Sequence, residues 1–154
     1  MNQFDTFENV DACCELANAI VASACDDYRH YNKHFCKNLD LMQYITERLG
    51  EIKHGGEEYP EEWNNLKLVK DNTELDQRKL QSKIAEIEEF LQSHYGMILS
   101  HGLGEVILEK IKKEQPVSEP SAERGRTLFK KKEKQMQKRL EKLLKRRKNE
   151  QLRP

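Results

Sequence analysis

Apolar side chains recur every three or four residues, without a break, over the first quarter of the chain. This spacing places them along one face of a helix, whereas a strand would send them to both faces. Over about four heptads, the pattern is typical of a helix that packs lengthwise against another helix. We therefore predict a long helix over residues 6–36. Its packing seam consists of Phe7, Val10, Cys14, Ala17, Val21, Ala24, Tyr28, Tyr31 and Phe35.

Similar apolar spacing predicts three further helices, over residues 40–53, 74–99 and 104–114. A loop is predicted over residues 54–72, because this segment is acidic, contains Pro60 and has no clean period. The sequence thus predicts an all-α fold. Its core is an elongated helical hairpin or coiled-coil-like bundle that occupies residues 1–114.

The end of the chain has a different composition. Two prolines and several small or polar residues predict a flexible linker over residues 115–125. The segment 126–154 is strongly basic, yet it contains a narrow apolar stripe. This combination predicts a cationic amphipathic helix. The stripe consists of Phe129, Met136, Leu140 and Leu143, with Leu144 beside it.

The formal net charge of zero conceals a separation of charge along the chain. Residues 124–154 contain 14 Lys and Arg against 3 Asp and Glu, whereas residues 1–123 contain 13 against 24. Charge asymmetry of this size favours a polyanionic partner for the basic segment. The cations predicted to bind nucleic acid are Arg124, Arg126, Lys130, Lys131, Lys132, Lys134, Lys138, Arg139, Lys142, Lys145, Arg146, Arg147 and Lys148.

No catalytic constellation or phosphate-binding loop is recognisable, so we predict neither enzymatic activity nor a cofactor. His30 and His34 have the spacing of two metal ligands on a helix, but the nearby cysteines are too far along the axis to complete a site. We therefore predict no metal. The four cysteines are expected to be reduced thiols, because no secretory signal is apparent.

Two stretches resemble a small protein family of prophages and integrative elements in Gram-positive bacteria. They are CELANAIVASACDDYRHY, over residues 14–31, and IEEFLQSHYGMILSHGLGEVILEKIKKE, over residues 87–114. The segment between them and the basic tail depart from the family pattern. The family has no established activity, so the resemblance implies only a context: an accessory protein of a phage or mobile element in a bacterial host cytoplasm.

Three functional hypotheses follow. The leading one is a non-catalytic protein that binds nucleic acid, or a nucleoprotein complex, through its basic C-terminal segment. The second is an anti-CRISPR-like inhibitor that contacts a host defence nuclease through the acidic core. The third is a structural homo-oligomer built on the first heptad seam. A membrane partner is not expected, because the apolar face of the basic segment is narrow.

Overall fold

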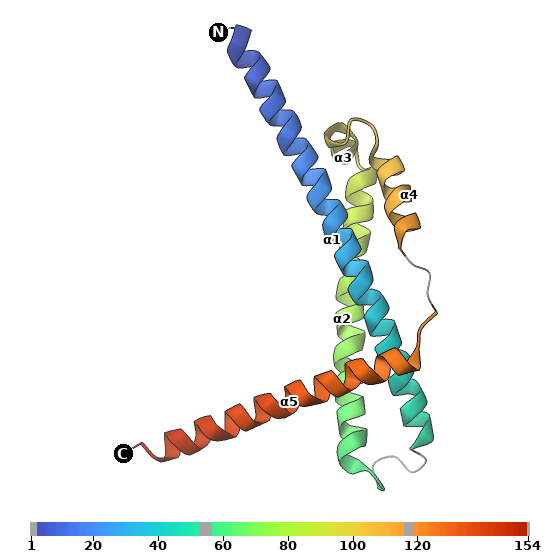
Figure 1. Cartoon of the computed structure of the whole chain (residues 1–154), viewed down its shortest axis with the longest axis vertical. Coiled ribbons are helices and arrows are strands. Elements are labelled where there is room, and N and C mark those ends of the chain that lie inside the picture. The colour runs from blue at the N-terminus through green and yellow to red at the C-terminus, as the bar shows by residue number, and fades with distance from the viewer. Residues whose placement is uncertain (1–2, 53–56, 116–118, 154) are drawn as a thin grey trace. The chain divides into compact units, whose positions relative to one another are not determined.

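The computed structural model describes residues 3–52, 57–115 and 119–153, with side chains described from residue 12 onward. Within these residues all regular elements are helices, which confirms the predicted all-α fold. The helices are α1 (Gln3–Glu51), α2 (Pro60–Gln92), α3 (His94–Leu99), α4 (Gly104–Glu114) and α5 (Ala122–Gln151) (Figure 1).

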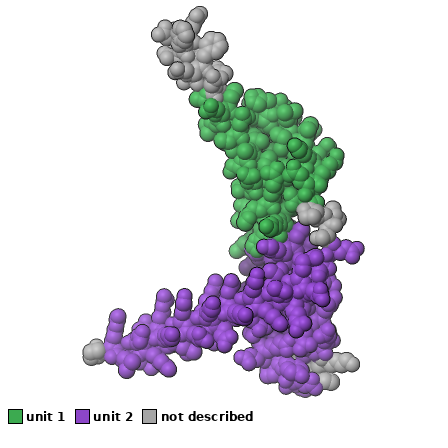
Figure 2. Space-filling model, in the orientation of Figure 1, with its two compact units in different colours: residues 1–35, 77–118 green, residues 36–76, 119–154 purple. Residues whose placement is uncertain are grey.

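The chain divides into two compact units, which are described separately (Figure 2). Unit 1 comprises Met1–Phe35 and Gln77–Ser118, and unit 2 comprises Cys36–Asp76 and Glu119–Pro154. In both units a part of α1 packs against a part of α2 to form a helical hairpin. Unit 1 adds α3 and α4 to this hairpin, whereas unit 2 adds α5.

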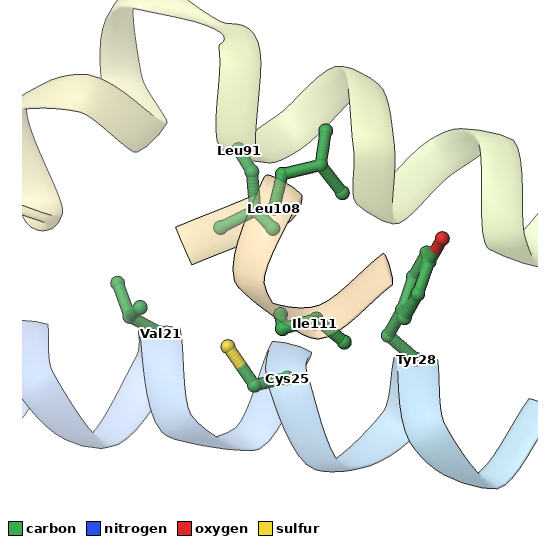
Figure 3. Packing of buried hydrophobic residues seen from close by; sticks show 6 residues of the cluster. All are labelled: Val21, Cys25, Tyr28, Leu91, Leu108 and Ile111. Atoms are coloured by element: carbon green, nitrogen blue, oxygen red, sulfur yellow. The ribbon is translucent and has the colours of Figure 1, made fainter. Parts of the chain in front are cut away.

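The core of unit 1 joins α1, α2 and α4 (Figure 3). Its buried members are Val21, Cys25, Tyr28, Leu91, Leu108 and Ile111. The hydroxyl of Tyr28 remains satisfied, because it donates a hydrogen bond of 3.1 Å to Oε1 of Glu88 on α2.

The predicted heptad seam lies largely on the packed side of α1. Val21 and Tyr28 are buried. Five other members are partly buried, namely Cys14, Ala17, Ala24, Tyr31 and Phe35. The side chains of Phe7 and Val10 lie outside the described part of the structure.

The predicted helix over residues 74–99 is interrupted at Ser93. Its hydroxyl accepts a hydrogen bond of 3.0 Å from the backbone N–H of Gly96, which caps the short helix α3. Further along, a Cβ at Gly104 would collide with the backbone carbonyl of Leu91. The start of α4 therefore packs directly on the end of α2, an approach that only glycine permits.

Two boundaries predicted near the middle of the chain are wrong. The helices predicted over 6–36 and 40–53 are one continuous helix, α1, because nothing between them breaks a helix. The loop predicted over 54–72 is also wrong from Pro60 onward, since α2 begins there. Proline suits the first helical position, where its missing N–H would have no intrahelical partner. The rest of that predicted loop includes residues 54–56, which lie outside the described residues.

The core of unit 2 explains why α2 begins so early. Leu66 and Val69, followed by Thr73, form a buried stripe at helical spacing that an acidic composition obscures. The buried apolar members of this core are Leu41, Ile45, Ile52, Leu66, Val69 and Phe129. Trp63 packs against them, and the Arg48 guanidinium joins α1 to α2 through hydrogen bonds of 2.6 and 3.1 Å to the two carboxylate oxygens of Glu62.

Candidate nucleic-acid interface

The basic segment begins inside unit 2 and is anchored there. The predicted flexible linker over 115–125 and helix start at 126 are wrong at this end, because α5 begins at Ala122. Ser121 is the N-cap, and its hydroxyl oxygen accepts from the backbone N–H of Arg124. A glutamate in the first turn also favours this end of the helix, since it complements the helix dipole. Residues 116–118 of the predicted linker lie outside the described residues.

Asp40 of α1 holds the first turn of α5. Its carboxylate accepts a hydrogen bond of 2.8 Å from the backbone N–H of Ser121, and bonds of 3.0 and 3.2 Å from the guanidinium of Arg124. The residue is 8% exposed, so burial by itself opposes ionisation. The bonds from Arg124 and Ser121 outweigh burial and hold the pKa of Asp40 below its ordinary value.

Gly125 and Phe129 then fix α5 on the hairpin of unit 2. A Cβ at Gly125 would collide with the backbone carbonyl of Asp40, so glycine lets the two helices touch. One turn later, the Phe129 ring is 1% exposed, and its centroid lies 5.4 Å from that of Tyr44. The beginning of the basic segment is therefore part of a hydrophobic core.

A groove of about 970 Å³ follows along unit 2, lined by side chains from α1, α2 and α5. Its charged members have both signs, and they are Arg48, Glu51, Glu61, Glu62, Arg126, Lys130 and Glu133. Burial, followed by the negative charge of Glu62, raises the pKa of Glu133. This groove is thus a mixed-charge surface and lacks the purely cationic character that a phosphate site requires.

The character of α5 changes from Gln137, which together with Leu140 forms the end of the groove lining. Every residue from Gln137 to Gln151 is exposed, and the end of α5 projects from the body of unit 2 (Figures 1 and 2). We call this segment the distal arm. It contains seven Lys and Arg against two Glu. None of these cations forms an ion pair within the part of the chain that the structure describes.

Five lysines of α5 form a continuous stripe, which we call the lysine stripe. Their spacings of three, four, four and three residues keep them within about 80° of helix surface, at 100° per residue. All five are exposed. At a rise of 1.5 Å per residue the stripe is about 21 Å long. Its members are Lys131, Lys134, Lys138, Lys142 and Lys145.

The apolar stripe runs along the opposite side of α5. Phe129 is buried and Met136 is partly buried in unit 2, but the continuation is open. In the distal arm Leu140, Leu143 and Leu144 are 57%, 56% and 51% exposed. We call these three side chains the leucine patch. The distal arm therefore presents a cationic face and an apolar face on opposite sides of one helix.

The thirteen cations predicted to bind nucleic acid fall into four groups. Arg124 is held by Asp40, and Arg126 with Lys130 lines the mixed-charge groove. Lys132 is partly buried. The other nine are exposed along α5, and they are Lys131, Lys134, Lys138, Arg139, Lys142, Lys145, Arg146, Arg147 and Lys148.

Sequence reasoning missed Asp40 and Gly125 as the residues that position α5. Asp40 is one acid among many in an acidic region, and its partner lies 84 positions away. The predicted linker over 115–125 includes Gly125, although Ser121 followed by charged helix formers and an aromatic residue is a usable signal for an N-cap.

The structure does not join the candidate metal ligands His30 and His34 to a third ligand among the described residues. Within the described residues no group of three or more His, Cys, Asp or Glu side chains is placed to hold an ion. The centroid of the His30 ring instead lies 6.0 Å from that of the Tyr31 ring.

In the part of the chain that the structure describes, none of the helices combines the length and apolar character that crossing a bilayer demands.

No protein-family model, curated protein or solved structure matches this chain.

Proposed function

We propose that this protein binds the phosphate backbone of nucleic acid through the lysine stripe of α5, without reading base sequence. The observation that carries the proposal is a helix anchored at one end in a hydrophobic core and exposed at the other, with five lysines in line. Lysine is a compact point charge that suits phosphate contacts, whereas the rigid fork of arginine favours bidentate recognition.

The dimensions of the stripe match such a partner. A duplex carries about one phosphate charge per 1.7 Å of its axis, so roughly twelve lie within the length of about 21 Å that the lysine stripe covers. Five lysines can each neutralise one of them. Because the anchor at Asp40, Gly125 and Phe129 orders the first turns of α5, the arm loses less conformational entropy on binding than a disordered tail would.

Binding to a fluorescently labelled duplex, measured by anisotropy, tests this proposal. We expect the full chain to bind duplexes of unrelated sequence with similar affinity. The triple variant Lys138→Gln, Lys142→Gln and Lys145→Gln removes the distal three members of the lysine stripe. It should lose about 500-fold in affinity at 0.1 M salt, since each phosphate contact releases about 0.9 counterion.

The matched control changes three exposed lysines of unit 1 by the same amount. Lys79→Gln, Lys110→Gln and Lys113→Gln alter the net charge equally but lie outside α5. This control should bind within a few fold of the wild type. Equal loss in both triple variants would show that net charge alone governs binding, and no loss in the α5 variant would refute the proposal.

A further inference from the structure

Two arginines of the distal arm lie side by side next to the lysine stripe. Arg139 and Arg146 are seven residues apart, so they lie within about 20° of each other around α5, at 100° per residue. Both are exposed. They lie about 80–100° around the helix from Lys138, the middle member of the lysine stripe. We call these two side chains the arginine pair.

Unit 2 leaves the lysine stripe and the arginine pair open together. Phe129 and Met136, which pack α5 on unit 2, lie about 180° and 160° around the helix from Lys138. The leucine patch continues on that side of α5. One large partner can therefore contact the lysine stripe and the arginine pair at the same time.

We infer that the distal arm lies in the major groove of a DNA duplex, where the arginine pair donates hydrogen bonds to N7 of purines. The major groove of B-form DNA is about 12 Å wide and admits an α-helix, whose diameter with side chains is about 10–12 Å. When the boundary between the lysine stripe and the arginine pair faces the groove floor, the lysines turn to the backbone on one side and the arginines reach the base edges. The leucine patch then faces out of the groove. This inference rests on the proposed function and names duplex DNA as the nucleic acid.

Contact with N7 is compatible with binding to unrelated sequences. N7 is an acceptor on both adenine and guanine, so every base pair offers one in the major groove. An arginine N–H can donate to either purine. Seven residues span about 10.5 Å along α5, which corresponds to about three base-pair steps of 3.4 Å. Each member of the arginine pair can thus meet a purine of its own.

Other nucleic acids fit this surface less well. Duplex RNA has a deep, narrow major groove that side chains cannot read. Single strands are typically bound by aromatic side chains on which their bases stack. Phe129 is the only aromatic residue of α5 and is 1% exposed. B-form DNA is therefore the partner that the lysine stripe and the arginine pair can contact together.

Duplexes that lack N7 test this contact. In the modified duplex 7-deazaadenine and 7-deazaguanine replace every adenine and guanine, so that C–H takes the place of N7 while the phosphates and the Watson–Crick edges stay the same. By anisotropy, the full-length wild type should bind the natural duplex at least tenfold more tightly, because hydrogen bonds from a charged donor are lost. The double variant Arg139→Met with Arg146→Met should bind both duplexes equally. Methionine is a good helix former without a donor.

The matched control replaces two other exposed arginines of unit 2, Arg147 and Arg153. Arg147 lies on the side of the leucine patch, and Arg153 follows the end of α5. Arg147→Met with Arg153→Met should therefore keep the wild-type preference for the natural duplex. An RNA duplex of the same sequence should bind the wild type at least tenfold more weakly than the DNA.

Three results would overturn the major-groove contact and leave phosphate binding intact. They are equal binding of the natural and modified duplexes by the wild type, an undiminished preference in the variant of the arginine pair, and equal affinity for RNA and DNA duplexes. Absence of binding to the natural duplex would overturn the proposed function as well.

Discussion

Replacing Gly125 with alanine tests whether α5 is held on unit 2 by direct contact between helix backbones. A Cβ at this position meets the carbonyl carbon of Asp40 at 2.7 Å and the Cβ of Tyr44 at 2.8 Å. Carbon atoms pack best at about 3.5–4.0 Å, so α5 would have to move outward by about 1 Å. Since these neighbours are backbone and Cβ atoms, they cannot rotate away.

The expected cost follows from two opposing effects. Overpacking of a well-packed site costs about 1–3 kcal/mol, and the rigidity of these neighbours places Gly125→Ala in the upper half of that range. Alanine regains about 1 kcal/mol as a better helix former. The free energy of unfolding should therefore fall by about 1–2 kcal/mol. Gly50, which has no atom within 4 Å of such a Cβ, provides the control, because Gly50→Ala should stabilise by up to about 1 kcal/mol.

Urea unfolding measured by tryptophan fluorescence distinguishes the two variants. Trp63 is the only tryptophan and packs in the core of unit 2, so its emission reports the unit to which α5 is anchored. At an m-value of about 2 kcal/mol/M the midpoint should fall by roughly 0.5–1 M for Gly125→Ala and rise slightly for Gly50→Ala. A Gly125→Ala midpoint at or above that of the wild type would refute close packing of α5 on α1.

Other side chains give further predictions. Tyr28→Phe should lower the free energy of unfolding by about 0.5–1.5 kcal/mol, because a partly buried hydrogen bond is lost. Tyr95→Phe, at a ring that is 62% exposed, should leave it unchanged. Both tyrosines lie in unit 1, so this urea titration is followed by far-UV circular dichroism, which reports the helices of both units. The pKa of Asp40 is lowered in the folded state, so its contribution to the free energy of unfolding is complete above its ordinary pKa of 3.8 and is lost as the pH falls below that value. Asp40→Asn should therefore reduce the slope of stability against pH on the acid side. An unchanged slope would contradict this. The pKa of Glu133 is raised in the folded state, so its ionisation disfavours the folded state as the pH rises through that pKa. Glu133→Gln should raise the midpoint of thermal unfolding at pH 7 and make less difference at pH 4. A lower midpoint at pH 7 would count against the burial of this carboxyl group.

The helical character of the chain was predictable because apolar spacing of three and four residues depends only on local geometry. The same reasoning placed α4 at residues 104–114, since Gly104 and the apolar positions of this helix are close together in sequence. The apolar spacing did not predict the first third of α2. This segment has only two buried apolar positions, Leu66 and Val69, and acidic residues outnumber them.

The contacts that hold the start of α5 on unit 2 could not be predicted from the sequence, for a different reason. The contact of Arg124 with Asp40 and the burial of Phe129 depend on which segment of α1 the basic helix meets, and no local pattern specifies that. The stripe from Phe129 to Leu143 was recognisable from its spacing. Its division into a buried beginning and an exposed end was not, because only tertiary packing distinguishes them.

The salt dependence of duplex binding tests the lysine stripe most directly. For five phosphate contacts, a plot of log K against log salt concentration should have a slope of about −4.5 for the wild type. Removing Lys138, Lys142 and Lys145 should reduce the slope to about −2, because two members of the stripe remain. The same slope in both proteins, or a wild-type slope near zero, would contradict binding of the phosphate backbone by this face of α5.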